Sequence, residues 1–259
     1  AFWESEWEAD YFRYIDKAAR LGFDILEIAA GPLPDYSPEK LKDLRKAAEA
    51  NNIELTVGHG PKPEQNLASP DADVRKNAAA FFTKLFGQME LLGARLIGGG
   101  LYSYWPVDYT QPFDKQEDWK RSVESIKALA PVAKECGITL CMEVLNRFEG
   151  YLLNTAEEGV RYVREVNEDN VKLMLDTFHM NIEESSMTEA IRQAGPLLGH
   201  FHTGRGTHAL VRDRARAAKH WLRGAGGHGA FCASRRHCGP KHQDLAGSDR
   251  PCTHHRGTG

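Results

Sequence analysis

The sequence predicts an α/β protein of the (β/α)8 TIM-barrel class, incomplete at its first strand and after its seventh strand. Short apolar segments alternate with amphipathic segments along residues 1–204, which is typical of βαβ units and a parallel sheet. The apolar segments recur roughly every 30 residues, and this spacing favours a closed barrel over an open doubly wound sheet. No GxGxxG sequence follows the first strands, so a dinucleotide-binding fold is disfavoured.

Proline, glycine and capping residues delimit the elements of the N-terminal half. A helix should end at Gly22, and Ser37 as N-cap with Pro38 at the first helical position should start the next one. Ser69 and Pro70 repeat this device before a long helix. The expected elements are a helix over residues 8–21, a strand over 23–28, a helix over 38–51, a strand over 53–58, a helix over 71–92 and a strand over 95–100.

The same alternation continues through the C-terminal half. Pro131 should break or bend the helix that contains it. Thr155 and Glu158 form a capping-box sequence that opens a further helix. The expected elements are a helix over residues 115–136, a strand over 138–143, a helix from 155, a strand over 171–176, a helix over 187–194 and a strand over 197–202.

The composition of the 259-residue chain indicates a globular protein with one large domain. No segment approaches the roughly 18 consecutive apolar residues of a membrane span. The first residues, AFWESEWEADYF, lack the basic and then apolar pattern of a secretory signal. We therefore expect a cytoplasmic enzyme with no membrane partner. The cysteines number five, and an odd number fits no disulfide framework, so reduced thiols are expected.

Residues 205–259 differ in kind from residues 1–204. The first 204 residues hold 22 Lys+Arg and 33 Asp+Glu, a net charge of -11, whereas residues 205–259 hold 11 and 3, a net charge of +8. The acidic body argues against nucleic acid as the main partner. Arginine, histidine and glycine dominate the later segment, which contains no glutamate and no apolar period of strand length. We treat it as an unclassified tail.

Three of the expected strands end in residues that can bind a metal ion. Glu143, Asp176 and His202 close consecutive strands, and the carboxyl ends of barrel strands form the catalytic rim. A carboxylate that ends an apolar strand is costly unless it is paired or coordinated. One such residue could belong to a structural ion pair, but three at the same level predict a shared divalent cation. Two oxygen donors and one nitrogen donor suit Mn²⁺, Co²⁺, Fe²⁺ or Zn²⁺.

Further polar and aromatic residues belong to the same rim. Glu149 lies in the loop after Glu143, and His179 follows Asp176 by three residues, where it could donate to a sugar oxygen or serve as a core histidine. His59, Gly60 and Pro61 end another strand, and Gly60 permits close approach of the backbone. Two loop aromatics are expected to form walls against a sugar, namely Trp7 and Trp105.

Several segments resemble the ketose 3-epimerases, the D-tagatose and D-psicose (D-allulose) 3-epimerase family of the xylose-isomerase-like barrel superfamily. The resemblance covers residues 1–204 almost continuously. The motifs LNRFE and LDTFHMNIEE are specific to this family, and the other matching segments are WESEWEADY, GFDILEIAAGPLPDYS, VGHGP, GGGLYSYWPVDY and GHFHTG. Residues 1–204 are accordingly identified as most of a barrel of this kind.

The resemblance implies a divalent metal, usually Mn²⁺ or Co²⁺, held by two glutamates, an aspartate and a histidine. The first glutamate corresponds to Glu143, the aspartate to Asp176 and the histidine to His202. The implied substrate contacts are Trp7, Gly60, Leu101, Trp105, Glu149 and His179. The family is implied to act in carbohydrate metabolism, and an intact barrel of this kind is expected to form a homodimer or homotetramer.

The resemblance also implies the reaction. Free ketoses, such as D-fructose and D-psicose or D-tagatose and D-sorbose, are interconverted at C3. One metal-bound glutamate, here Glu143, removes the C3 proton, and the cation stabilises a cis-enediolate. The second metal-bound glutamate reprotonates the opposite face, because inversion needs delivery from the side opposite to removal.

The sequence departs from the family after Gly204. Arg205 stands where the family has glutamate, His208 stands where a substrate-binding arginine is expected, and the MEPF motif that carries the second glutamate does not occur. We interpret residues 205–259 as frame-shifted or disordered, and resequencing the gene after the Gly204 codon tests this. The chain as written is expected to show little or no epimerase activity.

Alternative interpretations remain open. An aldose–ketose isomerase of the same superfamily shares the fold, and a truncated chain with only residual metal binding would be non-catalytic. The tail cysteines and histidines could bind zinc, although their spacing fits no CxxC framework. A contact between the arginine-rich tail and nucleic acid is weakly indicated.

Overall fold

A computed structural model of the chain describes residues 10–203 and 230–231. Trp7, Arg205 and His208 lie outside the described residues, as does nearly all of the segment that we interpret as a frame-shifted or disordered tail.

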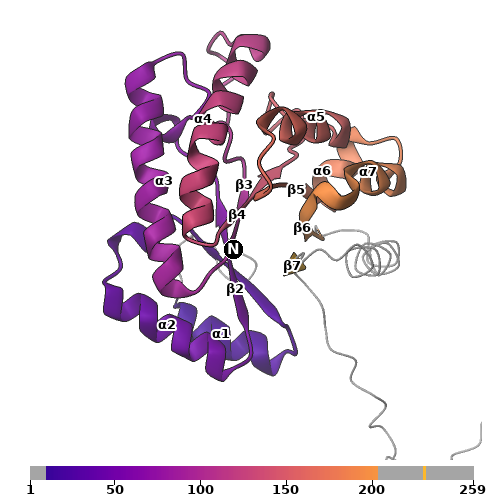
Figure 1. The fold of residues 1–259 in the computed structure, drawn as a ribbon. Helices are drawn as coiled ribbons and strands as arrows, with labels where there is room; N and C mark the ends of the chain where they lie inside the picture. Colours follow the sequence, from indigo (N-terminus) through magenta and orange to yellow (C-terminus); the bar gives the residue numbers. More distant parts are fainter. Residues whose placement is uncertain (1–9, 204–229, 232–259) are drawn as a thin grey trace, which may run out of the picture.

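The described strands form one parallel sheet in which each strand pairs with the next strand of the chain. The order β1-β2-β3-β4-β5-β6-β7 contains no crossover past a neighbour (Figure 1). The strands are β1 Ile25–Ala29, β2 Glu54–His59, β3 Leu96–Gly99, β4 Thr139–Glu143, β5 Val171–Asp176, β6 Leu198–His202 and β7 Ala230–Phe231. Glu27 on β1 nevertheless contacts His200 on β6 at 3.0 Å, so the sheet curls as the wall of a barrel does.

Helices follow the strands and pack outside the sheet (Figure 1). They are α1 Tyr11–Arg20, α2 Pro38–Ala50, α3 Ala72–Leu92, α4 Lys115–Glu135, α5 Ala156–Val166, α6 Thr177–Glu183 and α7 Met187–Ala194, with short 3-10 turns at Leu33–Asp35, Pro63–Gln65 and Gly195–Leu197. The inward face of α3 shows why they dock, because Phe82, Leu85, Phe86 and Met89 are completely buried.

The observed caps agree in part with the expected ones. Ser37 caps α2 by accepting from the backbone N–H of Lys40 at 3.2 Å, as predicted. Ser69 does not cap α3, because its hydroxyl accepts from the N–H of Asp71 in the turn before the helix. Asp71 is the N-cap instead. The expectation of a Ser69-Pro70 cap is therefore wrong by two residues.

The helix that contains Pro131 was expected to be broken or bent there, and the expected break does not occur, whereas the bend stays a prediction. α4 continues through Pro131, which lies exposed on the outer side of the helix. The proline leaves the carbonyl of Lys127 without its helical donor, but Lys127 is exposed too, so water can supply the missing hydrogen bond.

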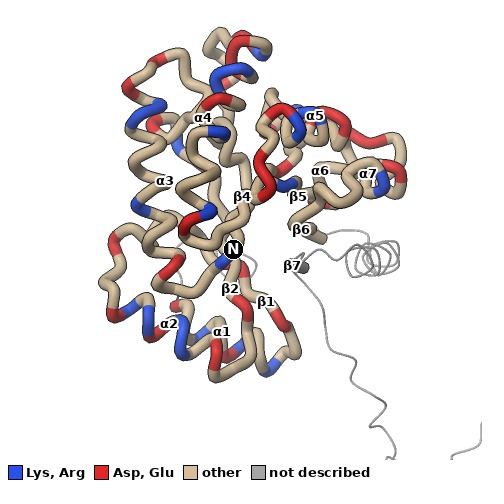
Figure 2. Tube along the Cα trace, viewed as in Figure 1, with Lys and Arg blue, Asp and Glu red and all other residues tan. Residues whose placement is uncertain are grey.

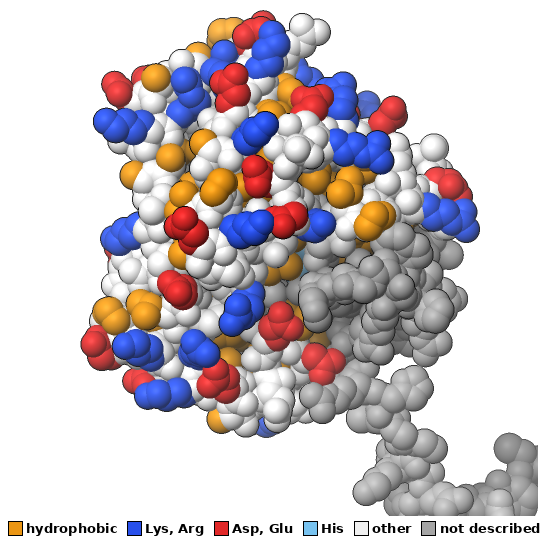
Figure 3. Space-filling view, viewed as in Figure 1, with side chains coloured by type: hydrophobic (Ala, Val, Ile, Leu, Met, Phe, Trp, Pro, Cys, Tyr) orange, Lys and Arg blue, Asp and Glu red, His pale blue; other side chains and the backbone are white. Residues whose placement is uncertain are grey.

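Acidic and basic side chains alternate over the outer helices (Figure 2). The face shown in Figure 3 likewise mixes both signs rather than gathering one of them. This distribution suits a solvated helical surface. No helix of the described part is both long enough and apolar enough to cross a bilayer.

Candidate metal centre at the carboxyl ends of the strands

The three residues predicted as metal ligands meet at one end of the sheet. Glu143 ends β4, Asp176 ends β5 and His202 ends β6. One donor atom from each lies within 4.8 Å of the donor atoms of the other two. Asp176 and His202 are direct partners in the register of β5 and β6, so the pairing of the strands itself holds them side by side. Their side chains are only 15 to 21% exposed.

Asp176 is oriented by the helix that begins after it. Its Oδ1 accepts from the backbone N–H of Phe178 at 2.6 Å and so caps α6, a helix that the sequence did not lead us to expect. Its Oδ2 lies 3.7 Å from His202 Nδ1, which is longer than a hydrogen bond. One carboxylate oxygen therefore serves the fold, and the other faces the shared space between the ligands.

The second ring nitrogen of His202, Nε2, contacts residues on β1 and β6. It lies 3.1 Å from Glu27 Oε2 and 3.0 Å from His200 Nε2. Burial alone would lower the pKa of His202, but the negative charges of Glu27, Glu143 and Asp176 outweigh burial and raise that pKa to about 9. The same charges would attract a cation.

Glu27 and His200 are not among the residues predicted from the sequence. Glu27 Oε2 lies 3.0 Å from Nε2 of the fully buried His200. Burial raises the pKa of Glu27, but the neighbouring His202 and His200 outweigh burial and lower it overall. The sequence feature that could have revealed Glu27 is its charge inside the apolar strand ILEIA. Burying a charge in such a strand is costly unless the charge is paired.

His179 is buried and contacts Glu143. Its Nδ1 lies 3.2 Å from the backbone N–H of Asn146 and 2.8 Å from the side-chain amide of Asn146. Since both are donors, Nδ1 accepts and Nε2 carries the proton. That Nε2 lies 3.5 Å from Glu143 Oε1. Burial lowers the pKa of His179, but the charge of Glu143 and its hydrogen bond outweigh it, so the pKa rises.

Asn146 is a second residue that the sequence did not lead us to expect. It is 1% exposed, and its amide nitrogen lies within hydrogen-bonding distance of both His179 and Glu149 Oε1, the latter at 2.9 Å. Its place in the loop directly after Glu143 was the available signal. Asn146 thus joins two residues implied to bind substrate.

The predicted wall residues also meet. Trp105 Nε1 donates to Glu149 Oε2 at 3.2 Å. A Cβ added to Gly60 would lie 3.1 Å from the Trp105 ring, so an alanine there would require the ring to shift by a few tenths of an ångström. Leu101 follows β3 and is buried, with 1% of its surface exposed.

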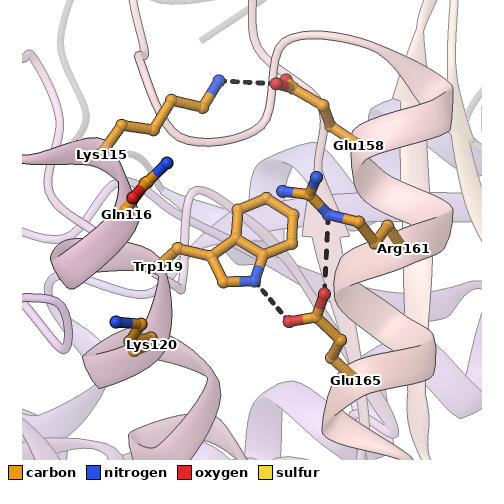
Figure 4. A pocket seen from close by; sticks show the side chains of 7 residues that line it. All are labelled: Lys115, Gln116, Trp119, Lys120, Glu158, Arg161 and Glu165. Carbon is orange, nitrogen blue, oxygen red and sulfur yellow. Dashed lines mark hydrogen bonds and ion pairs between the residues drawn. The ribbon is translucent and has the colours of Figure 1, made fainter.

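A separate hollow of about 590 Å³ lies between α4 and α5 (Figure 4). Five of the side chains that line it contact one another. The Arg161 guanidinium stacks 4.0 Å from the centroid of the Trp119 ring, and Trp119 Nε1 donates to Glu165. Lys115 pairs with Glu158 at 2.6 Å. These contacts join two helices, and none of the residues predicted for the site takes part.

His59, at the end of β2, forms a wall of the barrel end. Its ring stacks on Phe81 at 5.3 Å between centroids and meets the edge of Phe82 at 5.6 Å. Its Nε2 is buried without a hydrogen-bond partner among the described residues. Burial lowers the pKa of His59 to about 4.

Mild acid should therefore destabilise the fold through His59. The unfolded residue titrates near about 6.5, so between that pH and about 4 the unfolded chain binds more protons and the free energy of unfolding falls. Between pH 7 and 5 the contribution amounts to about 2 kcal/mol. The free energy of unfolding can be measured with denaturant at both pH values. Its loss between pH 7 and 5 should be smaller in His59→Gln than in the unmodified chain by about 2 kcal/mol. Equal losses in the two proteins would contradict this role.

The donor set of Glu143, Asp176 and His202 fits a divalent cation. Two carboxylate oxygens and an imidazole nitrogen converge within 4.8 Å, and the 3.7 Å between Asp176 Oδ2 and His202 Nδ1 is longer than a hydrogen bond. Carboxylate and imidazole donors suit several first-row ions, so these residues alone do not select one. Since this group has three members among the described residues, water or substrate oxygens would complete the coordination.

Several known proteins are similar to this chain in sequence or in structure. A family model described as a xylose isomerase-like TIM barrel matches residues 15–228. The D-psicose 3-epimerase of Ruminiclostridium cellulolyticum is 62% identical over 204 residues, covering 79% of this chain and 70% of that protein. The D-psicose 3-epimerase of Agrobacterium fabrum is 54% identical, covering 79% and 71%. A crystal structure of D-psicose 3-epimerase with D-tagatose from Clostridium cellulolyticum H10 has a TM-score of 0.84 at 56% identity, covering 89% of this chain and 81% of that one.

Proposed function

This chain belongs to the xylose isomerase-like TIM-barrel family and, within it, to the ketose 3-epimerases, and from that premise we propose that its described site removes the C3 proton of a free ketose. The family membership confirms the predicted barrel class and the predicted class of enzyme, an isomerase that acts on carbohydrates. The single observation that carries the proposal is the convergence of Glu143, Asp176 and His202 on one space.

Glu143 is the proposed base. Its carboxylate is partly buried at the rim, and His179 Nε2–H points toward its Oε1 from 3.5 Å. That contact orients the carboxylate, because His179 is held in place by Asn146 on its other side. A proton α to a carbonyl is only weakly acidic, so a base held at a fixed point beside C3 is needed.

The proposed cofactor is Mn²⁺ or Co²⁺, held by Glu143, Asp176 and His202. When bound, such an ion polarises the carbonyl at C2 and stabilises the negative charge that develops on the sugar oxygens. The chain's own contribution is to orient the donors, through the α6 cap for Asp176 and through Glu27 for His202.

The substrate contacts are proposed from residues that lie around the same rim. Glu149 and His179 offer polar atoms to sugar hydroxyls, and the Asn146 amide connects the two. Trp105 packs against Gly60 and presents a ring suited to the apolar face of a sugar. Leu101 lines the buried side, and Trp7 stays a proposal from the sequence because it lies outside the described residues. D-fructose, D-psicose, D-tagatose and D-sorbose are the proposed substrates.

We also propose that this chain is impaired as an epimerase. Residues 205–259 contain no glutamate, and the MEPF motif that is implied to carry the second base does not occur there. With Glu143 alone, the proton is removed from one face of C3 and returned to the same face. Exchange of the C3 hydrogen should then proceed without inversion.

This behaviour can be measured directly. In D2O with Mn²⁺, one of two C3-epimeric ketoses should gain deuterium at C3 while its epimer stays absent from the NMR spectrum. Rapid conversion of D-fructose to D-psicose would contradict the impairment, because it requires a second base. Deuterium at C1 instead of C3 would favour an aldose–ketose isomerase. No exchange at all, with or without Mn²⁺, would favour a non-catalytic chain.

A cytoplasmic location is proposed from the cysteines of the described part. Cys136 and Cys141 are both free thiols, and free thiols are typical of reducing compartments. Assembly into a homodimer or homotetramer stays a prediction.

A further inference from the structure

Glu27 lies on β1 with 20% of its side chain exposed, and it contacts His202 on β6 at 3.1 Å. We propose that Glu27 is a positioning residue, which holds Nε2 of His202 protonated and thereby presents Nδ1 to the cation. This inference rests on the metal site proposed above. A histidine that binds a metal commonly donates its other ring N–H to a carboxylate, and this second contact sets which nitrogen is free.

The contacts of Glu27 favour one tautomer of His202. A carboxylate only accepts, and Glu27 Oε2 lies 3.1 Å from His202 Nε2 and 3.0 Å from His200 Nε2. An unprotonated Nε2 on His202 would set its lone pair against that oxygen. His200 Nε2 also lies 3.0 Å from His202 Nε2, and both nitrogens face the same carboxylate oxygen. In the proposed form both nitrogens donate to Glu27, and neutral His202 keeps its lone pair on Nδ1, the atom that lies 3.7 Å from Asp176 Oδ2.

The fold makes room for this carboxylate with a glycine. A Cβ added to Gly58 on β2 would lie only 2.7 Å from Glu27 Oε1. His200 supports the carboxylate from the other side and is fully buried. Glu27 thus has the space left by Gly58 on β2 and a contact from His200 on β6, and a carboxylate held in this way can orient the His202 ring through a single contact.

Glu27, His200 and His202 could in principle bind a second metal ion, since their donor atoms also converge. The two groups share His202, however, and the nitrogen that faces Glu27 is not the one that faces Asp176. Two ions would need an imidazole stripped of both its ring protons. A single ion at Nδ1 with a hydrogen bond at Nε2 needs only the neutral ring. The geometry favours the single ion.

Mn²⁺ affinity tests the proposal in the full chain. Glu27→Gln should weaken binding by about 10- to 100-fold, because the amide no longer enforces the Nε2–H form. The matched control is Glu54→Gln, the same change at an exposed position on β2, which should leave the affinity unchanged. Circular dichroism of both metal-free variants checks that the fold is retained. Unchanged affinity in a folded Glu27→Gln protein would overturn the proposal.

A second measurement needs no variant. In the chain loaded with diamagnetic Zn²⁺, nitrogen NMR should show His202 protonated at Nε2 and bound to metal at Nδ1. Metal bound at Nε2, or two ions per chain with one lost in Glu27→Gln, would overturn the positioning role while leaving the metal site in place. Failure of the unmodified chain to bind Mn²⁺, Co²⁺ or Zn²⁺ would overturn the proposed function itself, and the positioning role with it.

Discussion

Replacing Glu143 with glutamine is expected to abolish deuterium exchange at C3 and to weaken Mn²⁺ binding. Glutamine has nearly the same shape, but it cannot take up a proton and it removes one of the two negative charges that face the cation. Loss of a general base costs about 10²- to 10⁴-fold in rate, and the loss of a metal ligand adds to this. Exchange in D2O should therefore fall by at least about 10³-fold, as followed by proton NMR.

Two comparisons separate the roles of Glu143. Glu135→Gln makes the same change at an exposed position of α4 and should exchange as the unmodified chain does. Asp176→Asn removes a proposed ligand but leaves the base in place, so its exchange should recover in part at high Mn²⁺ concentration, whereas Glu143→Gln should not recover. A Glu143→Gln protein that exchanges at the unmodified rate would exclude Glu143 as the base.

Gly99→Ala is expected to have the largest effect on stability. Gly99 ends β3 with φ near +130°, and an added Cβ would lie 2.0 Å from the backbone oxygen of His59. Neither the backbone angle nor the neighbouring strand can accommodate the methyl group without breaking the pairing of His59 with Gly99. The free energy of unfolding should fall by more than about 3 kcal/mol, which unfolds many domains outright.

The control for this prediction is another glycine. Gly87 lies within α3, and an added Cβ would meet nothing within 4 Å. Gly87→Ala should be neutral or stabilise the protein by up to about 1 kcal/mol, because alanine is the better helix former. Urea unfolding of both variants provides the comparison. A Gly99→Ala protein as stable as the Gly87→Ala protein would show that β2 and β3 are not packed as described.

Strand ends could be predicted from the sequence because an apolar run that closes on a charged residue is visible locally. Glu143 and Asp176 are the last residues of β4 and β5, and His202 is the last residue of β6. Parallel pairing then places such ends at the same edge. The neighbours of these residues could be inferred only where they lie in the same loop, as Glu149 does.

Glu27 could not be placed in the same way. Its partners His200 and His202 lie more than 170 residues later in the chain, and only the curl of the sheet brings β1 to β6. Asn146 could not be predicted for a different reason, since an amide that contacts two other side chains has no sequence pattern of its own. The predicted N-cap at Ser69 was wrong because a serine in a turn can accept a hydrogen bond from a backbone N–H of the same turn.

The convergence of Glu143, Asp176 and His202 on one cation is most directly tested by a crystal structure of the chain grown with Mn²⁺. Anomalous difference density collected for manganese should show one strong peak, bonded to a carboxylate oxygen of Glu143, to Oδ2 of Asp176 and to Nδ1 of His202. A well-ordered site with no peak between these three side chains, at a Mn²⁺ concentration that saturates binding in solution, would contradict the account.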